Sequence, residues 1–312
     1  MFQHRVEKFG PYQKFILENK ETGDCVSVVP ECGACVLQVT LGGQDILDGY
    51  HTPEELEKMS WSKNVLLFPF PNRLKDGKYT FEGKTYEYPI NNADTQNAIH
   101  GHGRAQAMEV TEISADEQGA FITCAYQDAG LSPSFPFPHR FVVTFSLLSS
   151  HRFEVAMSLH NEGASEMPAG LGWHPYFKLN DDVADLKMQL PDCQMIEIDG
   201  RMLPTGAQTP YKDFETLKNI GATVLDNGFT ISDRSKNAEI RLVAPQGELR
   251  YWQQTGEQKF NFVQIFTPPH RNCVAIEPMS CNIDAFNNQD GLAVLKSQEY
   301  VGGSFGVAWI KE

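Results

Sequence analysis

The clearest structural signal in this sequence is the stretch Phe141-Val-Val-Thr-Phe-Ser-Leu-Leu-Ser-Ser-His-Arg-Phe-Glu-Val-Ala-Met-Ser-Leu159. Apolar side chains alternate with other residues on both sides of the Ser149-Ser150 step, and this period of two predicts strands that each bury one face. A short polar step between two such segments is typical of an antiparallel hairpin. We therefore expect Phe141–Leu148 and Phe153–Leu159 to be neighbouring strands.

The same alternation recurs along most of the chain, whereas helical patterns are few and short. A second hairpin is predicted over Tyr79–Tyr88, turning near Glu82-Gly83. Short helices are predicted at Pro53–Met59, which has proline and acids in its first turn, and at Asp213–Ile220, before Gly221. The other segments with strand periodicity are Cys25–Val29, Val36–Thr40, Phe121–Tyr126, Ile240–Val243, Phe260–Phe266 and Val274–Ile276.

Many strands separated by turns predict an all-β fold, either a sandwich or a barrel. The 25 glycines and 18 prolines supply the turns, and the missing alternation of strands with long helices argues against a doubly wound nucleotide-binding fold. The proline-rich stretch Ser132–Pro138 has strands on both sides, so it is interpreted as a rigid loop and not as a linker. We expect a single domain over residues 1–312, with a few short helices.

The charge balance and the apolar content limit the classes of partner and the cellular location that can be expected. The chain has 312 residues, with 40 acidic and 26 basic side chains, and its formal net charge is −14. No basic stripe is available to neutralise phosphates, so neither nucleic acid nor an anionic membrane is an expected partner. There is no run of 18 apolar residues, and the first residues lack the apolar run of a signal peptide. These features predict a cytoplasmic protein.

The seven cysteines are expected to be reduced thiols, because their number is odd and they are scattered through the chain. Cys32 and Cys35 have the spacing of half a zinc site, but a zinc ribbon needs a second such pair, which the sequence does not contain. The pair lies in a strand-like pattern, so both side chains are interpreted as small buried apolar groups.

Common nucleotide-binding, metalloprotease and serine-hydrolase patterns are absent from the sequence. Polar residues gather instead in four turn-rich segments, where a rigid scaffold usually carries function. The first segment, Phe68–Leu74, alternates prolines with aromatic residues before Arg73, whose planar fork of donors suits an oxygen-rich ligand. The alternative for this arginine is a surface ion pair with an acid.

The second segment, Asn91–Gly103, is dense in amides, which are suited to hydrogen-bonding sugar hydroxyls. His100 lies between Ile99 and Gly101, so a ligand or the backbone can approach it closely. His102 would point to the opposite face if the segment is extended. No metal is predicted at this His-x-His pair, because no third ligand is evident.

The third and fourth segments each present one titratable side chain between glycines, prolines and apolar residues. His174 lies in Ala169–Phe177, among aromatic side chains that could stack on a sugar, and histidine can act as an acid or a base near neutral pH. Glu277 ends an apolar strand, where burial would raise its pKa toward the range of a general base. A structural histidine and a buried ion pair are the alternatives. Asp226 is a weaker candidate, since an Asp-Asn-Gly run is most often a turn.

These segments, taken in order, resemble the aldose 1-epimerase (galactose mutarotase) family. The resemblance runs from about Gly23 through nearly the whole chain, and the His174-Pro-Tyr-Phe177 block is its most specific part. The matching pieces are Pro71-Asn-Arg73, Ile99-His-Gly101, Gly172–Phe177, Leu225-Asp226, Ile276-Glu-Pro278 and Gly291–Leu295.

The resemblance implies a galactose mutarotase-like supersandwich, a large antiparallel β-sandwich with an open sugar cleft. It implies a cofactor-free interconversion of the α and β anomers of a free monosaccharide, by a monomer or homodimer. It assigns Glu277 as the base that removes the C1 hydroxyl proton and His174 as the acid that protonates the ring oxygen. Arg73, His100 and Asp226 would hold sugar hydroxyls.

Two segments depart from the family pattern and leave the sugar open. Ala107-Met-Glu109 stands where the family typically leads to a tryptophan, and Met279–Asn287 resembles a bacterial branch whose sugar is less certain than galactose.

Three other functions are weighed against this one. A hexose-6-phosphate 1-epimerase would need basic residues for the phosphate, and Arg104 and Arg271 could serve, although the acidic net charge argues against it. A non-catalytic sugar-binding protein would be expected to have lost His174 or Glu277. A polysaccharide hydrolase or lyase would usually need a second carboxylate beside the scissile bond, and no such partner stands out.

Overall fold

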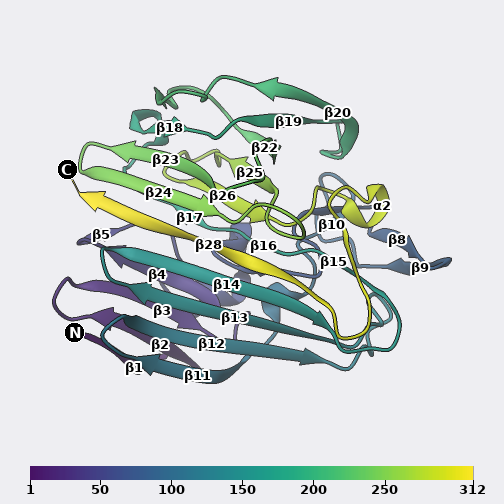
Figure 1. Ribbon diagram of the computed structural model, residues 1–312, viewed down its shortest axis with the longest axis horizontal. Coiled ribbons are helices and arrows are strands. Elements are labelled where there is room, and N and C mark those ends of the chain that lie inside the picture. Colours follow the sequence, from purple (N-terminus) through teal and green to yellow (C-terminus); the bar gives the residue numbers. More distant parts are fainter. Residues whose placement is uncertain (312) are drawn as a thin grey trace.

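The computed structural model describes residues 1–311 and is built mainly from antiparallel sheets (Figure 1). The first sheet follows the order of the sequence. Its strands are β1 (Phe2–Phe9), β2 (Tyr12–Asn19), β3 (Asp24–Val29), β4 (Cys35–Leu41) and β5 (Gln44–Asp45).

The second sheet has nine strands, and the last strand of the chain lies in its middle. In spatial order these strands are β11 (Glu109–Ala115), β12 (Gly119–Asp128), β13 (His139–Leu148), β14 (Arg152–Asn161), β28 (Tyr300–Lys311), β24 (Gly247–Gln253), β23 (Ala238–Ala244), β18 (Lys187–Gln189) and β21 (Lys218–Asn219). β28 pairs with β14 on one side and with β24 on the other, so it joins the two halves of this sheet (Figure 1).

The third sheet carries most of the candidate site. Its strands, in spatial order, are β20 (Pro204–Tyr211), β19 (Cys193–Ile198), β22 (Asp226–Ile231), β25 (Phe262–Phe266), β26 (Val274–Met279), β16 (Gly172–Trp173) and β6 (Leu66–Leu67), while β17 (Tyr176–Phe177) also pairs with β26.

Short ribbons and turns complete the architecture. The two-stranded ribbons are β7 (Arg73–Lys75) with β10 (Asn97–Ile99), β8 (Lys78–Phe81) with β9 (Lys84–Glu87), and β15 (Met167–Ala169) with β27 (Ala293–Leu295). The helices are α1 (Pro53–Lys58) and α2 (Ala285–Asn288), and the 3-10 turns are η1 (Ser60–Ser62), η2 (Gly103–Ala105) and η3 (Val183–Asp185).

The expected all-β sandwich is confirmed, and so is the hairpin expected over residues 141–159. β13 and β14 pair from His139↔Asn161 to Leu148↔Arg152, and alternate residues of β13 are buried as the period of two requires. The first sheet packs against β11, β12 and β13 (Figure 1). The largest apolar cluster includes side chains from Phe2 to Trp309, which supports our proposal that the chain is one domain.

The local predictions for residues 53–59 and 79–88 are also confirmed. α1 begins after Thr52, whose side chain accepts a hydrogen bond from the Glu55 amide at 3.2 Å. β8 and β9 form the predicted hairpin, with Glu82 and Gly83 in left-handed conformations at the turn. Cys32 and Cys35 are buried in a small apolar cluster, as interpreted from their pattern.

The helix predicted at Asp213–Ile220 is wrong. Lys218–Asn219 forms β21 against β18, and the Ile220 amide donates to the Leu186 carbonyl. Phe214 is fully buried, and its carbonyl accepts from the Leu190 amide. The backbone of this segment is thus satisfied by neighbouring strands, and tertiary pairing overrides a weak local helix preference.

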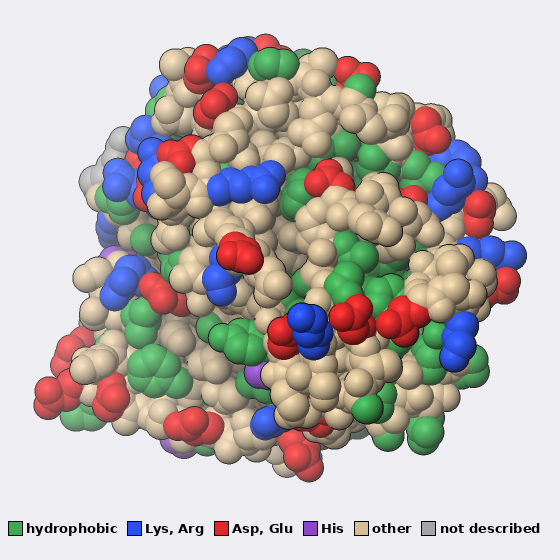
Figure 2. Space-filling view, turned by 45° about the vertical axis from the view of Figure 1, so that its right-hand side comes forward, with side chains coloured by type: hydrophobic (Ala, Val, Ile, Leu, Met, Phe, Trp, Pro, Cys, Tyr) green, Lys and Arg blue, Asp and Glu red, His purple; other side chains and the backbone are tan. Residues whose placement is uncertain are grey.

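Among the described residues, no helix is long and apolar enough to cross a membrane. On the face drawn in Figure 2, acidic and basic side chains are interspersed, with apolar patches between them.

Candidate active site

One cavity collects all five residues that the sequence singled out. It has a volume of about 320 Å³, and its lining includes Arg73, His100, His174, Asp226 and Glu277. A volume of this size suits a small-molecule ligand. The five side chains come from elements far apart in the chain, and the pairing of strands in the third sheet and the β7–β10 ribbon brings them together.

Glu277 and His174 form a buried pair in this cavity. Nε2 of His174 lies 3.5 Å from Oε1 of Glu277, and the two side chains are 7% and 2% exposed. Glu277 is on β26, and His174 lies between β16 and β17, which both pair with β26. The His174 ring stacks on Tyr176 with centroids 4.9 Å apart. The histidine is therefore held beside the carboxyl group by strand pairing and by stacking.

Gly172 and Asn64 explain the local path of the chain around the histidine. A Cβ on Gly172 would lie 2.7 Å from Cβ of Pro71 and 2.9 Å from the Pro278 carbonyl oxygen, so only glycine fits this close approach. The fully buried Asn64 accepts from the Tyr176 amide through its side chain and donates to the His174 carbonyl through its backbone. The glycine and the asparagine together fix the backbone on both sides of the ring.

Burial changes the protonation of this pair in a way that suits proton exchange. Burial raises the pKa of Glu277 well above its usual value, repulsion from Asp226 adds to the shift, and Arg73 opposes it. Burial also lowers the pKa of His174 to about 3, assisted by the positive charges of Arg104 and Arg73. Both shifts favour a neutral carboxyl and a neutral imidazole, so the pair holds one proton between two groups.

The cavity also gathers polar atoms that lack partners. Among residues 1–311, eight buried side-chain nitrogen or oxygen atoms have no hydrogen-bond partner. Each such atom costs about 1–3 kcal/mol unless something binds it. Four of the eight belong to residues that line this cavity, namely Nε of Arg73, Nδ1 of His174, Oε1 of Gln264 and Oε2 of Glu277. A ligand rich in hydroxyl groups would satisfy them.

Asp226 lies in a strand and not in a turn, so the turn interpretation of Asp-Asn-Gly is wrong. It begins β22 and pairs with Phe266 of β25, because cross-strand hydrogen bonds outweigh the local turn preference. Its Oδ1 accepts a hydrogen bond from Nε2 of Gln264 at 2.8 Å. Burial raises the pKa of Asp226, while Arg73 and Gln264 lower it. Asp226 thus lines the cavity with a side chain that Gln264 holds in place.

Arg73 and His100 are brought together by the β7–β10 ribbon, in which Arg73 pairs with Ile99. Nδ1 of His100 lies 2.8 Å from the Pro71 carbonyl, which can only accept, so Nδ1 carries the hydrogen and Nε2 is the acceptor. The His100 ring meets the His174 ring edge to face, with centroids 5.1 Å apart. Gly101 turns the chain with a φ of 60°, and a Cβ there would lie 2.1 Å from the Phe68 carbonyl oxygen.

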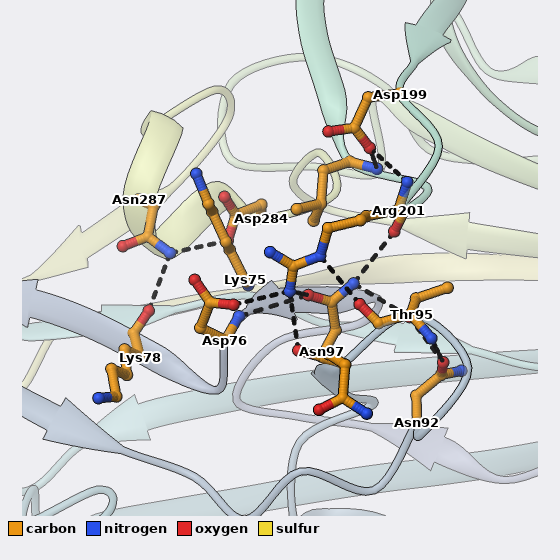
Figure 3. Close-up of polar contacts among 12 residues, drawn as sticks. Lys75, Asp76, Lys78, Asn92, Thr95, Asn97, Asp199, Arg201, Asp284 and Asn287 are labelled. Atoms are coloured by element: carbon orange, nitrogen blue, oxygen red, sulfur yellow. Dashed lines mark hydrogen bonds and ion pairs between the residues drawn. The ribbon is translucent and has the colours of Figure 1, made fainter.

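One wall of the cavity is held by a hydrogen-bonded cluster around Arg201, which we call the Arg201 clamp (Figure 3). Nε of Arg201 donates to the Thr95 carbonyl at 3.0 Å, and Nη2 donates to the Gln96 carbonyl and to side-chain oxygens of Asp76 and Asn97 at 2.7 to 3.0 Å. The clamp fixes the loop that follows Asn91 and Asn92, both of which line the cavity.

Sequence reasoning missed several side chains of the lining, among them Gln264 and Trp61. Gln264 faces Glu277 across β25 and β26, and its only signal was a polar residue in the middle of the apolar run Phe262–Phe266. Trp61 is 49% exposed and stacks on Phe266 with centroids 6.1 Å apart. An exposed aromatic ring at a cavity rim can stack on a sugar face, but nothing in the local sequence marks Trp61 for that position.

Arg104 and Arg271, the two arginines considered as phosphate ligands, lie in different parts of the fold. Arg104 lines the cavity and donates to Oγ of Ser62 at 2.6 Å. Arg271 donates to the backbone carbonyls of Gly221 and Thr223 and is outside the lining.

Comparisons with known proteins identify the family and the fold. The family model for aldose 1-epimerase matches residues 15–306. The chain is 29% identical over 283 residues to YihR, an uncharacterized protein of Escherichia coli K12, covering 88% of this chain and 87% of that protein.

Solved structures show the fold. A galactose mutarotase-like protein from Clostridium acetobutylicum superposes with a TM-score of 0.88 at 19% identity, covering 100% of this chain and 99% of that one. A galactose 1-epimerase from Lactobacillus acidophilus NCFM superposes with a TM-score of 0.85 at 16% identity, with the same coverage of 100% and 99%. The architecture is therefore the galactose mutarotase-like fold, as expected from the sequence.

Proposed function

We propose that this chain, which belongs to the aldose 1-epimerase family, interconverts the α and β anomers of a free aldose through Glu277 and His174. The observation that carries the proposal is the buried pair, 3.5 Å apart, in a cavity whose lining residues include polar atoms without partners. Anomer exchange needs one group that takes a proton and one that gives a proton, and this pair supplies both.

Ring opening begins with Glu277 as the carboxylate and His174 as the imidazolium. Glu277 takes the proton of the C1 hydroxyl while His174 gives a proton to the ring oxygen. The bond between C1 and the ring oxygen breaks, and a carbonyl forms at C1. The products of this step are the open-chain aldehyde, a neutral carboxyl and a neutral imidazole, so protons and electrons balance.

Burial favours the neutral carboxyl and the neutral imidazole, so ring opening first requires the proton of Glu277 to pass to His174 across their 3.5 Å contact. The nearby Arg73 favours the carboxylate that this transfer leaves. Rotation about the C1–C2 bond then presents the other face of the aldehyde. Reclosure reverses the transfers: His174 takes the proton of the C5 hydroxyl, and Glu277 returns a proton to the C1 oxygen.

Arg73, His100 and Asp226 complete the proposal as sugar-binding residues. Arg73 lowers the pKa of Glu277 and has an unpartnered Nε, so it can keep the carboxylate charged while it donates to a hydroxyl oxygen. Nε2 of His100 accepts, and the Asp226 carboxylate accepts, which gives the site acceptors for two sugar hydroxyls.

A hexose-6-phosphate 1-epimerase is the second candidate, and Arg104 is the observation that favours it. Arg104 lines the cavity and could pair with a phosphate. Against it, the lining also contains the carboxyl groups of Asp226 and Glu277, and Arg271 is bound elsewhere. The presence of both members of the acid–base pair supports catalysis over simple sugar binding. We include a cytoplasmic location and a monomeric or homodimeric state in the proposal, which cell fractionation and light scattering test.

Polarimetry of freshly dissolved α-D-glucose and α-D-galactose tests the function. We expect the wild type to accelerate mutarotation, Glu277→Gln and His174→Asn to reduce the acceleration strongly, and His160→Gln, a histidine of β14 outside the cavity, to preserve it. If a folded wild type accelerates neither sugar, glucose 6-phosphate is assayed with Arg104→Met as the matched variant. Failure with that substrate as well would overturn catalysis and favour a sugar-binding protein.

A further inference from the structure

A second cluster of titratable side chains lies outside the sugar cavity, at His102, Asp128 and His139. One ligand atom from each residue lies within 4.8 Å of the other two. Asp128 and His139 face each other directly across β12 and β13, and His102 enters from the turn after β10. Cross-strand partners on one face have Cβ atoms about 4.5–5.5 Å apart, so this convergence follows from the register of the sheet.

Both histidines in the cluster have an unsatisfied nitrogen. Nε2 of His102 and Nε2 of His139 are buried without a hydrogen-bond partner, and the His139 side chain is 0% exposed. Nδ1 of His139 lies 2.8 Å from the Phe137 carbonyl, which can only accept. Nδ1 therefore carries the hydrogen, and Nε2 presents a lone pair that no protein group satisfies.

Each of the three side chains is oriented by a second contact that leaves a ligand atom available. Nδ1 of His102 is 3.0 Å from the Tyr88 hydroxyl, which can accept from Nδ1–H and so leave Nε2 as the acceptor, whereas Nδ1 of His139 meets a carbonyl. The Asp128 carboxylate accepts from the Tyr126 hydroxyl at 2.7 Å and from the Gly130 amide at 2.6 Å, one bond on each oxygen. Metal-binding imidazoles and carboxylates are typically held by outer contacts of this kind.

Aromatic rings surround the cluster and keep its inner side dry. Phe135 packs against both imidazoles, with centroids 5.3 Å from His139 and 5.9 Å from His102, and Phe68 packs against His102 at 5.9 Å. His102 and Asp128 are only partly buried, so an ion can enter from their side. Because these surroundings are apolar, the two unsatisfied nitrogens cost more free energy than they would in water. An ion placed between them would interact with them more strongly for the same reason.

We propose that His102, Asp128 and His139 bind a divalent first-row metal ion, with Zn²⁺ as the ion of choice and water as the fourth ligand. Two imidazole nitrogens and one carboxylate oxygen are a donor set that suits zinc. Bonds of about 2.0–2.2 Å in a tetrahedral site place ligand atoms about 3.4 Å apart. The three side chains therefore need to converge by at most about 1.5 Å, which small side-chain rotations provide.

The ion would tie the turn after β10 to the second sheet. His102 is two residues beyond His100, so a metal bound to His102, β12 and β13 fixes the segment that presents His100 to the sugar cavity. The proposed role is structural and independent of the sugar reaction. It holds whether or not the chain turns out to be an epimerase.

The test uses the full chain, stripped with EDTA and dialysed, and Zn²⁺ alone as the probe in isothermal titration calorimetry. We expect one equivalent to bind the wild type, with the affinity falling about 100-fold or more in His102→Gln and in Asp128→Asn. His160→Gln, a partly buried histidine of β14 bonded to Ser158, is the matched control and keeps the wild-type affinity. Zn²⁺ should raise the Tm of the wild type and the control but not that of the two variants.

A spectrum with Co²⁺ in place of Zn²⁺ provides a measurement that does not depend on the variants. Ligation by two imidazoles and a carboxylate gives visible d–d bands without the intense near-ultraviolet charge transfer of a thiolate ligand. Absence of stoichiometric binding, binding that survives both substitutions, or a thiolate band from the cysteines would each overturn the proposal.

Discussion

The lining of the candidate active site and the Arg201 clamp are built from the same kinds of polar side chain, but they differ in how completely these groups are paired. In the clamp, the Arg201 guanidinium donates to Asp76, Asn97 and two backbone carbonyls (Figure 3). In the cavity, Arg73, His174, Gln264 and Glu277 each leave a buried atom without a partner.

This difference in pairing distinguishes residues that stabilise the fold from residues whose polar atoms are available to a ligand. A satisfied network rigidifies a protein even where it is partly exposed, as at Arg201 and Asp76, whereas an unsatisfied buried group costs free energy that a bound molecule recovers. We therefore expect substitutions in the cavity to remove activity without loss of stability, and substitutions in the clamp to do the reverse.

The largest effect is expected from Glu277→Gln. Loss of the base should reduce kcat/KM for mutarotation by about 10⁴-fold, the upper end of what one proton-transfer group contributes. Because burial raises the pKa of Glu277 in the fold, the wild type loses stability as the pH rises through that folded-state pKa. The glutamine variant should lack this loss, so its Tm should equal or exceed that of the wild type, by a growing margin toward alkaline pH. A Tm that falls together with activity would show that Glu277 stabilises the fold.

A smaller effect is expected from His174→Asn, about 10²-fold in kcat, because water can enter the space left by the shorter side chain and deliver a proton. The double variant with Glu277→Gln should be no slower than Glu277→Gln alone, since groups that act as a unit are not additive. Stopped-flow polarimetry measures both. Losses that multiply would mean that the two residues do not share one step.

Arg201→Met should affect stability and leave the chemistry intact. Removing its hydrogen bonds should lower the free energy of unfolding by about 1–3 kcal/mol in urea titrations. KM should rise several-fold through the loosened wall at Asn91 and Asn92, with kcat unchanged. Arg250→Met, which removes an exposed ion pair with Glu248, is the control and should cost less than about 1 kcal/mol. An equal cost for both variants would contradict the contrast between the clamp and the surface.

The smallest effect is a displacement of the pH profile in Arg73→Met. Arg73 lowers the pKa of Glu277, so its removal should raise that pKa, and the acidic limb of kcat/KM should move to higher pH. Activity lost at low pH should then be partly regained at high pH. An acidic limb that stays in place would show that Arg73 acts on the sugar alone.

Local patterns predicted the strands and the positions of the catalytic candidates. Alternation is a property of neighbouring residues, so β13, β14 and the hairpin at Glu82-Gly83 could be recognised from the sequence. His174 and Glu277 are marked by adjacent prolines and glycines that restrict the backbone.

Features that depend on register could not be predicted. Gln264 becomes part of the site because β25 places it opposite Glu277, and the His139–Asp128 contact exists only through the pairing of β12 with β13. The failed helix at Asp213–Ile220 has the same cause, since β18 supplies hydrogen bonds that a single sequence does not reveal.

The position of β28 between β14 and β24 has a consequence for how the chain is made. Until residues 300–311 have left the ribosome, the two halves of the nine-stranded sheet have no strand to join them, and β14 and β24 each expose an unpaired backbone edge. Such edges are templates for pairing with other chains. A chain in which β28 has not yet paired is therefore expected to aggregate more readily than the folded protein.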